Sequence, residues 1–198
     1  RTQRLSLLNR VSVALAQSLD IENILEVSLR EISGTLGVER ATAWLFEREV
    51  GTASAVVEYP RGDFPPSAVM PINNAVVLQH VWRKAAPLIV EDVSLVTDAN
   101  IRNELAENGV TAAVLLPMTI GGQSSGAFEL AVYDGPRRFD EEKVELALII
   151  ANQAAIAIEN ARQYQRVLEL KELLDNVFAS MASGVITTDV GDMITLCN

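Results

Sequence analysis

One long stretch organises this sequence, residues 144–181, which read VELALIIANQAAIAIENARQYQRVLELKELLDNVFASM. Apolar and amide side chains recur there in alternating steps of three and four, a period of about 3.5 that is typical of a left-handed coiled-coil seam. A second apolar stripe lies on a neighbouring face and fades after about Ala161. We therefore predict one helix whose first half covers a domain core and whose second half needs a partner. The seam comprises Leu146, Ile149, Gln153, Ile156, Asn160, Gln163, Val167, Leu170, Leu174, Val177 and Met181.

Composition narrows the classes of partner. The chain has 198 residues and a formal net charge of −10, from 16 basic and 26 acidic side chains. Nucleic acids and anionic membranes are bound by clustered lysine and arginine, so this balance argues against both. The single cysteine, Cys197, excludes an intramolecular disulfide framework and fits a reducing compartment. There is no run of about 18 apolar residues and no signal-peptide pattern after Arg1. We expect a cytoplasmic piece of a longer protein.

Two helices are predicted before the first strand. Residues 4–19 carry leucines on one face at the spacing of an amphipathic helix. Asp20 is a favourable N-cap for the next helix, and Gly37 is a favourable terminator. The leucines of the first helix are Leu5, Leu8, Leu15 and Leu19.

Strands and short helices follow. Three nearly continuous apolar runs predict strands that are covered on both faces: Ala41–Phe46, Ala112–Met118 and Ala127–Tyr133. Shorter strand candidates are Ser54–Tyr59, Val69–Ile72 and Leu88–Val90, and short helices are predicted at Ala75–Lys84 and Ala99–Glu107. The stretch Gly121–Gly126 predicts a hairpin turn.

The last part of the chain predicts a long helix and a hairpin. Asp140 is a favourable N-cap, and the helix that it begins is expected to run unbroken to about Met181. After Ser183, two short apolar runs on either side of Gly191 predict a β-hairpin. Two strands alone are marginal in water, so we interpret the hairpin as the start of a truncated second domain.

The order of these elements, together with several local segments, resembles a GAF domain over roughly residues 5–165. The segments are Leu88-Ile89-Val90-Glu91-Asp92-Val93, Leu116-Pro117-Met118 with Gly121-Gly122 and Gly126-Ala127-Phe128-Glu129-Leu130, Arg138-Phe139-Asp140-Glu141-Glu142, and Ala151-Asn152-Gln153-Ala154-Ala155-Ile156-Ala157-Ile158-Glu159-Asn160-Ala161. The resemblance implies an α+β fold with a central antiparallel sheet. It also implies terminal helices on one face of that sheet and a ligand pocket of loops and short helices on the other.

The tail, residues 174–198, is similar to the opening of a PAS domain through Met181-Ala182-Ser183-Gly184-Val185-Ile186, Asp189, Gly191, Ile194 and Asn198. A GAF domain joined by a helix to a PAS domain resembles the sensory part of bacterial signalling proteins, first histidine kinases and then diguanylate cyclases. The implied organisation is a dimerisation helix at 1–19, a GAF domain at 20–162, a coiled-coil signalling helix at 163–181 and the start of a PAS domain at 182–198.

Several residues could contact a ligand in the implied pocket, and each also has an ordinary structural explanation. The candidates are Trp44, Phe64, His80, Trp82, Asp92 and Arg102. The two tryptophans and Phe64 can line a cavity or fill a core, and Arg102 can meet an anion or lie on a helix surface. His80 is the only histidine and has no patterned cysteine or carboxylate partner, so a structural role is favoured over a role as haem ligand or general base.

No catalytic residue, metal site or identifiable cofactor follows from these patterns. The carboxylates Asp63, Glu91, Asp92 and Asp98 match no known calcium or zinc spacing. Phe139-Asp140-Glu141 matches only part of the signature of cyclic-nucleotide-binding GAF domains, and helix capping explains Asp140. A reductase-type GAF enzyme needs cysteines inside the domain, and Cys197 lies outside it.

The seam predicts a parallel homodimer. Full burial of the five seam side chains from Val167 to Met181 contributes roughly 7–15 kcal/mol per chain, whereas association costs about 4–15 kcal/mol or more. The seam is therefore marginal alone, and we expect the leucines of residues 4–19 to join the interface. Gln153, Asn160 and Gln163 are polar interruptions of the seam, and Asn160 is interpreted as the one that fixes register, whereas Gln153 can instead face the domain.

The favoured function is a non-catalytic module that relays a small-molecule or upstream signal through a dimeric helix to a PAS and output domain. A ligand-free structural dimerisation module remains an alternative, as does the sensor part of a diguanylate cyclase. The residues expected in the dimer and signalling helix are Leu5, Leu8, Leu15, Ile156, Asn160, Gln163, Val167, Leu170, Leu174 and Val177.

Overall fold

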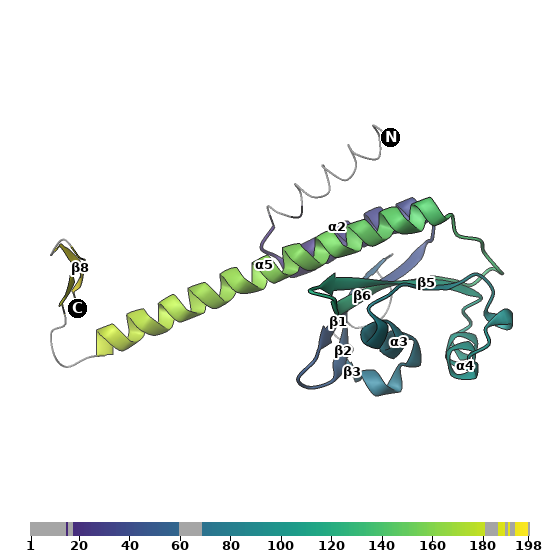
Figure 1. Ribbon diagram of the computed structural model, residues 1–198, viewed down its shortest axis with the longest axis horizontal. Helices are drawn as coiled ribbons and strands as arrows, with labels where there is room; N and C mark the ends of the chain where they lie inside the picture. The colour runs from purple at the N-terminus through teal and green to yellow at the C-terminus, as the bar shows by residue number, and fades with distance from the viewer. Residues whose placement is uncertain are drawn as a thin grey trace. The chain divides into compact units, whose positions relative to one another are not determined.

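A computed structural model describes residues 15, 18–59, 69–180, 186–188, 190 and 193–197. It divides the chain into two compact units, with the division between Glu159 and Asn160. In the first unit a six-stranded sheet carries helices α2 and α5 on one face and α3 and α4 on the other (Figure 1). This arrangement confirms the predicted α+β class with its two differently covered faces.

The sheet has the strand order β3-β2-β1-β6-β5-β4, and every neighbouring pair is antiparallel. Its strands are β1 Arg40–Glu47, β2 Thr52–Tyr59, β3 Val69–Pro71, β4 Leu88–Val90, β5 Ala112–Ile120 and β6 Gln123–Val132. The helices are α2 Ile21–Leu36, α3 Val76–Lys84, α4 Ala99–Glu107 and α5 Glu141–Ser180, with 3-10 turns η1 Ile72–Asn74 and η2 Val93–Leu95.

Helix α2 begins and ends where the sequence predicts. The Asp20 side chain accepts a hydrogen bond from the Glu22 N–H at 3.0 Å, and Gly37 takes a left-handed conformation with φ 65°. A carboxylate at the N-cap satisfies an exposed amide, and glycine adopts positive φ without steric cost. The inward-facing side chains, each 0% exposed, are Ile24, Leu25, Leu29 and Ile32.

The predicted hairpin turn at Gly121–Gly126 is too long. Only Gly121 and Gly122 form the turn, with φ of 57° and 78°, and β6 already begins at Gln123. Gly126 lies within β6, where the lack of a side chain lets neighbouring atoms approach closely. A Cβ there would lie 2.3 Å from the Trp44 carbonyl oxygen and 2.4 Å from Met118 Cε. Close packing between strands, and no turn, explains this glycine.

The register of the sheet shifts at two places near Gly126. Across β1 and β2, Ala43 pairs with Val57 but Trp44 pairs with Ala55. Across β5 and β6, Met118 pairs with Gly126 but Thr119 pairs with Ser124. Each shift leaves one extra residue on one strand, which is a β-bulge, and bulges redirect side chains and disrupt the local ladder.

Helix α5 has the two faces that its sequence predicts. Asp140 accepts from the Lys143 N–H at 3.0 Å, and the helix continues for 40 residues. On the domain-facing stripe Leu148 is half-buried and the other members are buried, namely Val144, Ala151, Ala155 and Ile158. By length and composition α5 could cross a membrane, and half of its most apolar window is buried, as in the core helix of a domain.

The second unit contains the rest of α5 and a two-stranded antiparallel sheet. Strands β7 Ile186–Thr188 and β8 Ile194–Cys197 form the predicted hairpin. The helix predicted at residues 4–19 lies outside the described residues, except that Leu15 is helical and residues 18 and 19 are not.

Candidate functional site

The face of the sheet beneath α3 and α4 holds a compact apolar cluster. Its buried members come from β1, β2, β4, β5, β6 and both helices, and include Phe46, Val81, Ile101, Leu115 and Ala127. Trp44 and Trp82 both pack against this cluster and are partly buried. The structure thus brings these two predicted pocket residues to the same face, whereas Phe64 lies outside the described residues.

A charged side chain lies in the middle of this face. Glu129 belongs to β6, which has three strands on one side (β1, β2 and β3) and two on the other (β5 and β4), so it lies near the centre of the sheet. Its Oε2 accepts a hydrogen bond from Trp44 Nε1 at 2.7 Å. Burial raises the pKa of Glu129 above its usual value, the bond from Trp44 opposes this, and the charges of Glu104 and Glu58 add to the rise. The carboxyl group therefore holds its proton more readily than an exposed glutamate.

A second carboxylate ties the two helices of this face together. Helix α3 begins after Ala75, which offers no side-chain cap. Glu104 of α4 supplies one instead, because its Oε2 accepts hydrogen bonds from the N–H groups of Val76 and Val77. Burial raises the pKa of Glu104, and these two backbone hydrogen bonds partly offset the rise. An anionic group at a helix N-terminus also complements the helix dipole.

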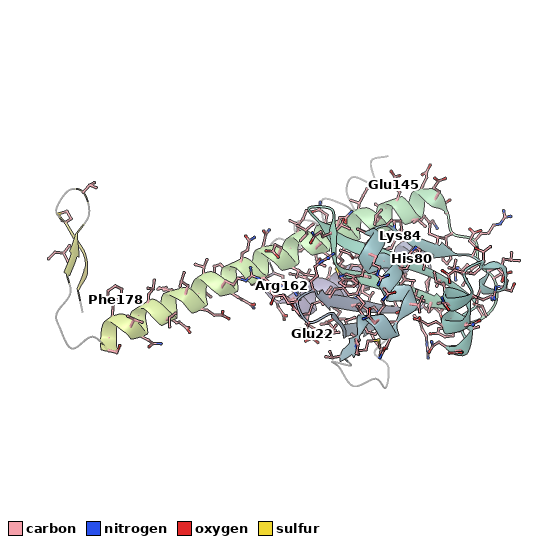
Figure 2. The ribbon with its side chains drawn as sticks, turned by 60° about the horizontal axis from the view of Figure 1, so that its bottom comes forward. Glu22, His80, Lys84, Glu145, Arg162 and Phe178 are labelled. Atoms are coloured by element: carbon pink, nitrogen blue, oxygen red, sulfur yellow. The ribbon has the colours of Figure 1, made fainter. Side chains whose placement is uncertain are left out.

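His80, one of the predicted pocket residues, lies on α3. Lys84 lies one turn further along the same helix (Figure 2). Burial lowers the pKa of His80, the Lys84 charge lowers it further, and Asp98 works in the opposite direction. Asp98 itself caps α4 by accepting from the N–H groups of Asn100 and Ile101. His80 is therefore partly buried and gives up its proton more readily than an exposed histidine.

Trp82 meets a cation on its ring. The Arg48 guanidinium lies 5.5 Å from the centroid of the Trp82 ring, and Arg48 also donates to the Ser124 carbonyl oxygen at 3.3 Å. Within the described residues, the buried Nε1 of Trp82 has no hydrogen-bond acceptor. An arginine on the face of an indole is a favourable cation–π pair, and it joins α3 to the β5–β6 hairpin.

Asp92 and Arg102 lie outside the apolar cluster of the α3–α4 face. Asp92 lines an open hollow of about 610 Å³ along the edge strand β4, where its carboxylate caps η2 by accepting from the Ser94 N–H and hydroxyl. Arg102 donates to the Val96 carbonyl oxygen at 2.9 Å. Both side chains have structural partners, and neither belongs to the cluster that contains the tryptophans.

Glu129 and Glu104 are site residues that the sequence patterns did not predict. Glu129 is the only charged residue in the otherwise apolar run Ala127–Tyr133, and a lone charge in a buried strand is a usable signal. Glu104 gave no such signal, because glutamate is ordinary on a short helix and its partner is 28 residues away in the sequence. Within the described residues, no three histidine, cysteine or acidic side chains converge as metal ligands.

The seam of α5 forms a second candidate surface. Its apolar members from Ile149 to Val177 are exposed, and their exposed fractions are Ile149 37%, Ile156 48%, Val167 64%, Leu170 57%, Leu174 48% and Val177 46%. Leu146 is buried against its own domain, and Met181 lies outside the described residues. Asn160 and Gln163 are exposed as well. Leu15 is only 2% exposed and is covered by its own chain, whereas Leu5 and Leu8 lie outside the described residues.

Comparison with known proteins identifies the fold family. The GAF domain model matches residues 18–159. Ethylene receptor 2 of Arabidopsis thaliana is 27% identical over 168 residues, which are 81% of this chain and 21% of the receptor. The transcriptional activator HyfR of Escherichia coli is 33% identical over 91 residues, which are 46% of this chain and 13% of HyfR. The chain thus spans about a fifth or less of the length of these relatives.

A solved structure supports the same assignment. The domain of a putative two-component sensor histidine kinase from Sinorhizobium meliloti 1021 is 27% identical, with a TM-score of 0.54, and the match covers 75% of this chain and 99% of that one. The family match covers well over half of the chain and includes every strand of the six-stranded sheet. This chain belongs to the GAF domain family.

Proposed function

We propose that this chain is the sensory and relay module of a larger signalling protein, and that it works as a parallel homodimer. In this proposal a small molecule or an upstream domain alters the packing on the α3–α4 face. The change passes through the sheet to α5, and the paired α5 helices carry it to a downstream domain. The module itself relays the signal and catalyses no reaction.

The observation that carries this proposal is the exposed seam of α5. Side chains such as Val167, Leu170 and Leu174 are roughly half exposed and follow a 3.5-residue period. That period is specific to helix pairs that wind around each other, and a helix that packed only on its own domain would not need it. The exposed part of the seam starts at Ile149, within the folded domain, and extends to Val177. A partner of the same sequence would therefore join both parts of the helix.

The similar proteins suggest which kind of larger protein this chain comes from. They include part of an ethylene receptor and a domain of a putative two-component sensor histidine kinase. We propose a cytoplasmic histidine kinase as the parent of this chain, with a PAS domain that begins at the β7–β8 hairpin. A diguanylate cyclase is the alternative parent. In both cases the output domain would read the geometry of the paired helices.

The seam can be tested by a pair of charge substitutions. In the proposed heptad, Leu170 and Leu174 are seam positions, whereas Leu168 is 43% exposed and lies beside the seam. Leu170→Glu and Leu174→Glu together should convert the dimer to a monomer, because each would place a charge in the apolar contact between helices. Leu168→Glu, the matched control, should leave the dimer intact.

Sedimentation equilibrium at micromolar concentration measures both variants beside the parent chain. A parent chain that sediments as a monomer over this range would refute the homodimer. So would a control that dissociates as readily as the seam variant, because the contact would then not follow the 3.5-residue period.

A second candidate function, a ligand-free dimerisation module, is favoured by the dense packing of the α3–α4 face. Val81 and Leu115 in that cluster are 0% exposed and Phe46 is 4% exposed. A thermal-shift screen over nucleotides, haem and small metabolites separates the two functions. A ligand that binds the folded state raises the melting temperature, and its effect should disappear in Glu129→Gln if the ligand lies on this face. A complete absence of shifts would favour the ligand-free module.

A further inference from the structure

A polar contact joins helix α5 to the sheet beside the bulge in β6. Asn152 of α5 accepts two hydrogen bonds at Oδ1, from the Thr119 N–H at 3.2 Å and from the Thr119 hydroxyl at 2.6 Å. Both residues are only partly buried, so the contact lies at the border of the interface. Thr119 reaches the helix at the place where the β5–β6 register shifts.

The apolar surface of α5 around this contact consists mostly of small side chains, with Ile150 and Ile158 as the larger members. Four alanines beside Asn152 are 0–1% exposed, namely Ala147, Ala151, Ala154 and Ala155, and Ile150 is buried among them at 0%. Helices are usually located by ridges of large side chains that fit into grooves, and alanine makes only low ridges. A one-residue slide moves a helix by about 1.5 Å and rotates it by about 100°. Such a slide would leave both donors of Thr119 without Asn152.

Backbone contacts connect the α3–α4 face of the sheet to Thr119. The Trp44 side chain packs on the α3–α4 face and donates to Glu129, but its carbonyl oxygen lies against Gly126. Gly126 is also the ladder partner of Met118, the residue before Thr119. These contacts form an unbroken series from Trp44 through Gly126 and Met118 to Thr119. The missing side chain at Gly126 leaves no slack between its neighbours.

We propose that Asn152 and Thr119 form the contact that sets the position of α5 on the sheet, and that this contact is coupled to Trp44 through Gly126. A change that moves Trp44 on the ligand-facing side would displace the backbone at Gly126, weaken the Thr119–Asn152 contact and release α5 over its alanine surface. This inference rests on the proposed relay and assigns it a route. Each contact can be altered separately, which makes the coupling between the two ends measurable.

The first experiment changes Thr119 and observes the tryptophans. The chain has two tryptophans, so its ¹⁵N NMR spectrum has two indole N–H signals, and Trp82→Phe assigns them. Thr119→Val keeps the shape of the side chain and removes its hydroxyl, whereas Thr119→Ser keeps the hydroxyl. We expect Thr119→Val to shift the Trp44 signal by more than its line width and to leave Trp82 in place, and Thr119→Ser to shift neither. Equal shifts of both signals, or none, would overturn the inference.

The reciprocal experiment changes the tryptophans and observes α5. Trp44→Phe removes the donor to Glu129. Trp82→Phe is the control because Trp82 shares the cluster but reaches β6 through the Arg48 side chain and not through the backbone contact between Trp44 and Gly126. Amide hydrogen exchange over residues 149–156 should become at least about threefold faster in Trp44→Phe and stay unchanged in Trp82→Phe. In a Thr119→Val background, Trp44→Phe should add little further acceleration. Equal effects of the two tryptophan variants, or purely additive effects, would contradict the route.

These measurements need no ligand. If the coupling is absent while the seam variants still separate dimer from monomer, the relay stands and uses another route. If the coupling is present but the chain is monomeric, the route stands and the proposed dimeric function fails. Should Trp44→Phe fold poorly, the indole measurement on Thr119→Val decides the question by itself.

Discussion

Replacement of Gly126 by alanine tests the packing at the centre of the sheet. The added Cβ would lie 2.3 Å from the Trp44 carbonyl oxygen, 2.4 Å from Met118 Cε and 3.4 Å from Leu45 Cα. The end of the Met118 side chain can rotate away, although Met118 is 0% exposed and has little room. The Trp44 oxygen belongs to the backbone of β1, so it can move only if the paired strands β1 and β6 separate.

The expected cost follows from these two responses. Overfilling a packed core costs about 1–3 kcal/mol, and a weakened ladder hydrogen bond adds about 0.5–1.5 kcal/mol. Gly126→Ala should therefore lower the free energy of unfolding by about 2–4 kcal/mol. For a domain of this size that corresponds to a fall in melting temperature of roughly 5–15 °C.

Gly34 provides the matched control. It lies in α2, and a Cβ there would meet nothing within 4 Å. Gly34→Ala should raise stability by about 0.5–1 kcal/mol, because alanine favours the helix and loses less backbone entropy on folding. Both variants are compared with the parent by urea and thermal unfolding, at one protein concentration because dimer formation would affect the result. A Gly126→Ala variant as stable as the parent would refute the close-packing argument, and so would equal destabilisation by Gly34→Ala.

Two further predictions concern the carboxylates. Asp98→Ala removes the acceptor for two amides of α4 and should lower the free energy of unfolding by about 1 kcal/mol in urea titrations. Asp98→Asn keeps an acceptor oxygen at the N-cap and should retain most of the stability of the parent chain. The pKa of Glu129 is raised in the folded state. At pH values between the pKa of the unfolded chain and that of the folded protein, Glu129 is therefore protonated to a greater extent in the folded protein. Its contribution to stability is therefore greatest at low pH and falls as pH rises through that window. Glu129→Gln still accepts from Trp44 and should remove this fall. An identical pH dependence of unfolding in the parent and in Glu129→Gln would contradict the prediction.

The sequence was sufficient for those features that depend on nearby residues. Helix α2 was predictable from the carboxylate at Asp20 and the glycine at position 37, since capping involves groups only a few residues apart. The two faces of α5 were predictable because helix geometry alone places residues three and four apart on one side. β4 was predicted with its observed bounds, Leu88–Val90, as a run of three apolar residues between Pro87 and Glu91. The β4 and α5 segments are also among those that resemble a GAF domain, the family that the comparison with known proteins identifies.

Contacts between distant residues were decided by the tertiary structure. Nothing in the local sequence pairs Glu104 with the start of α3, Glu129 with Trp44, or Asn152 with Thr119, because these partners are 28, 85 and 33 residues apart. The role of Gly126 was mistaken for turn formation, since a glycine-rich stretch looks the same whether it bends the chain or admits a neighbouring strand. The periodicity of apolar residues predicts which face of a helix or strand a side chain occupies. Only the folded sheet, which brings separate strands and helices together, determines what that side chain touches there.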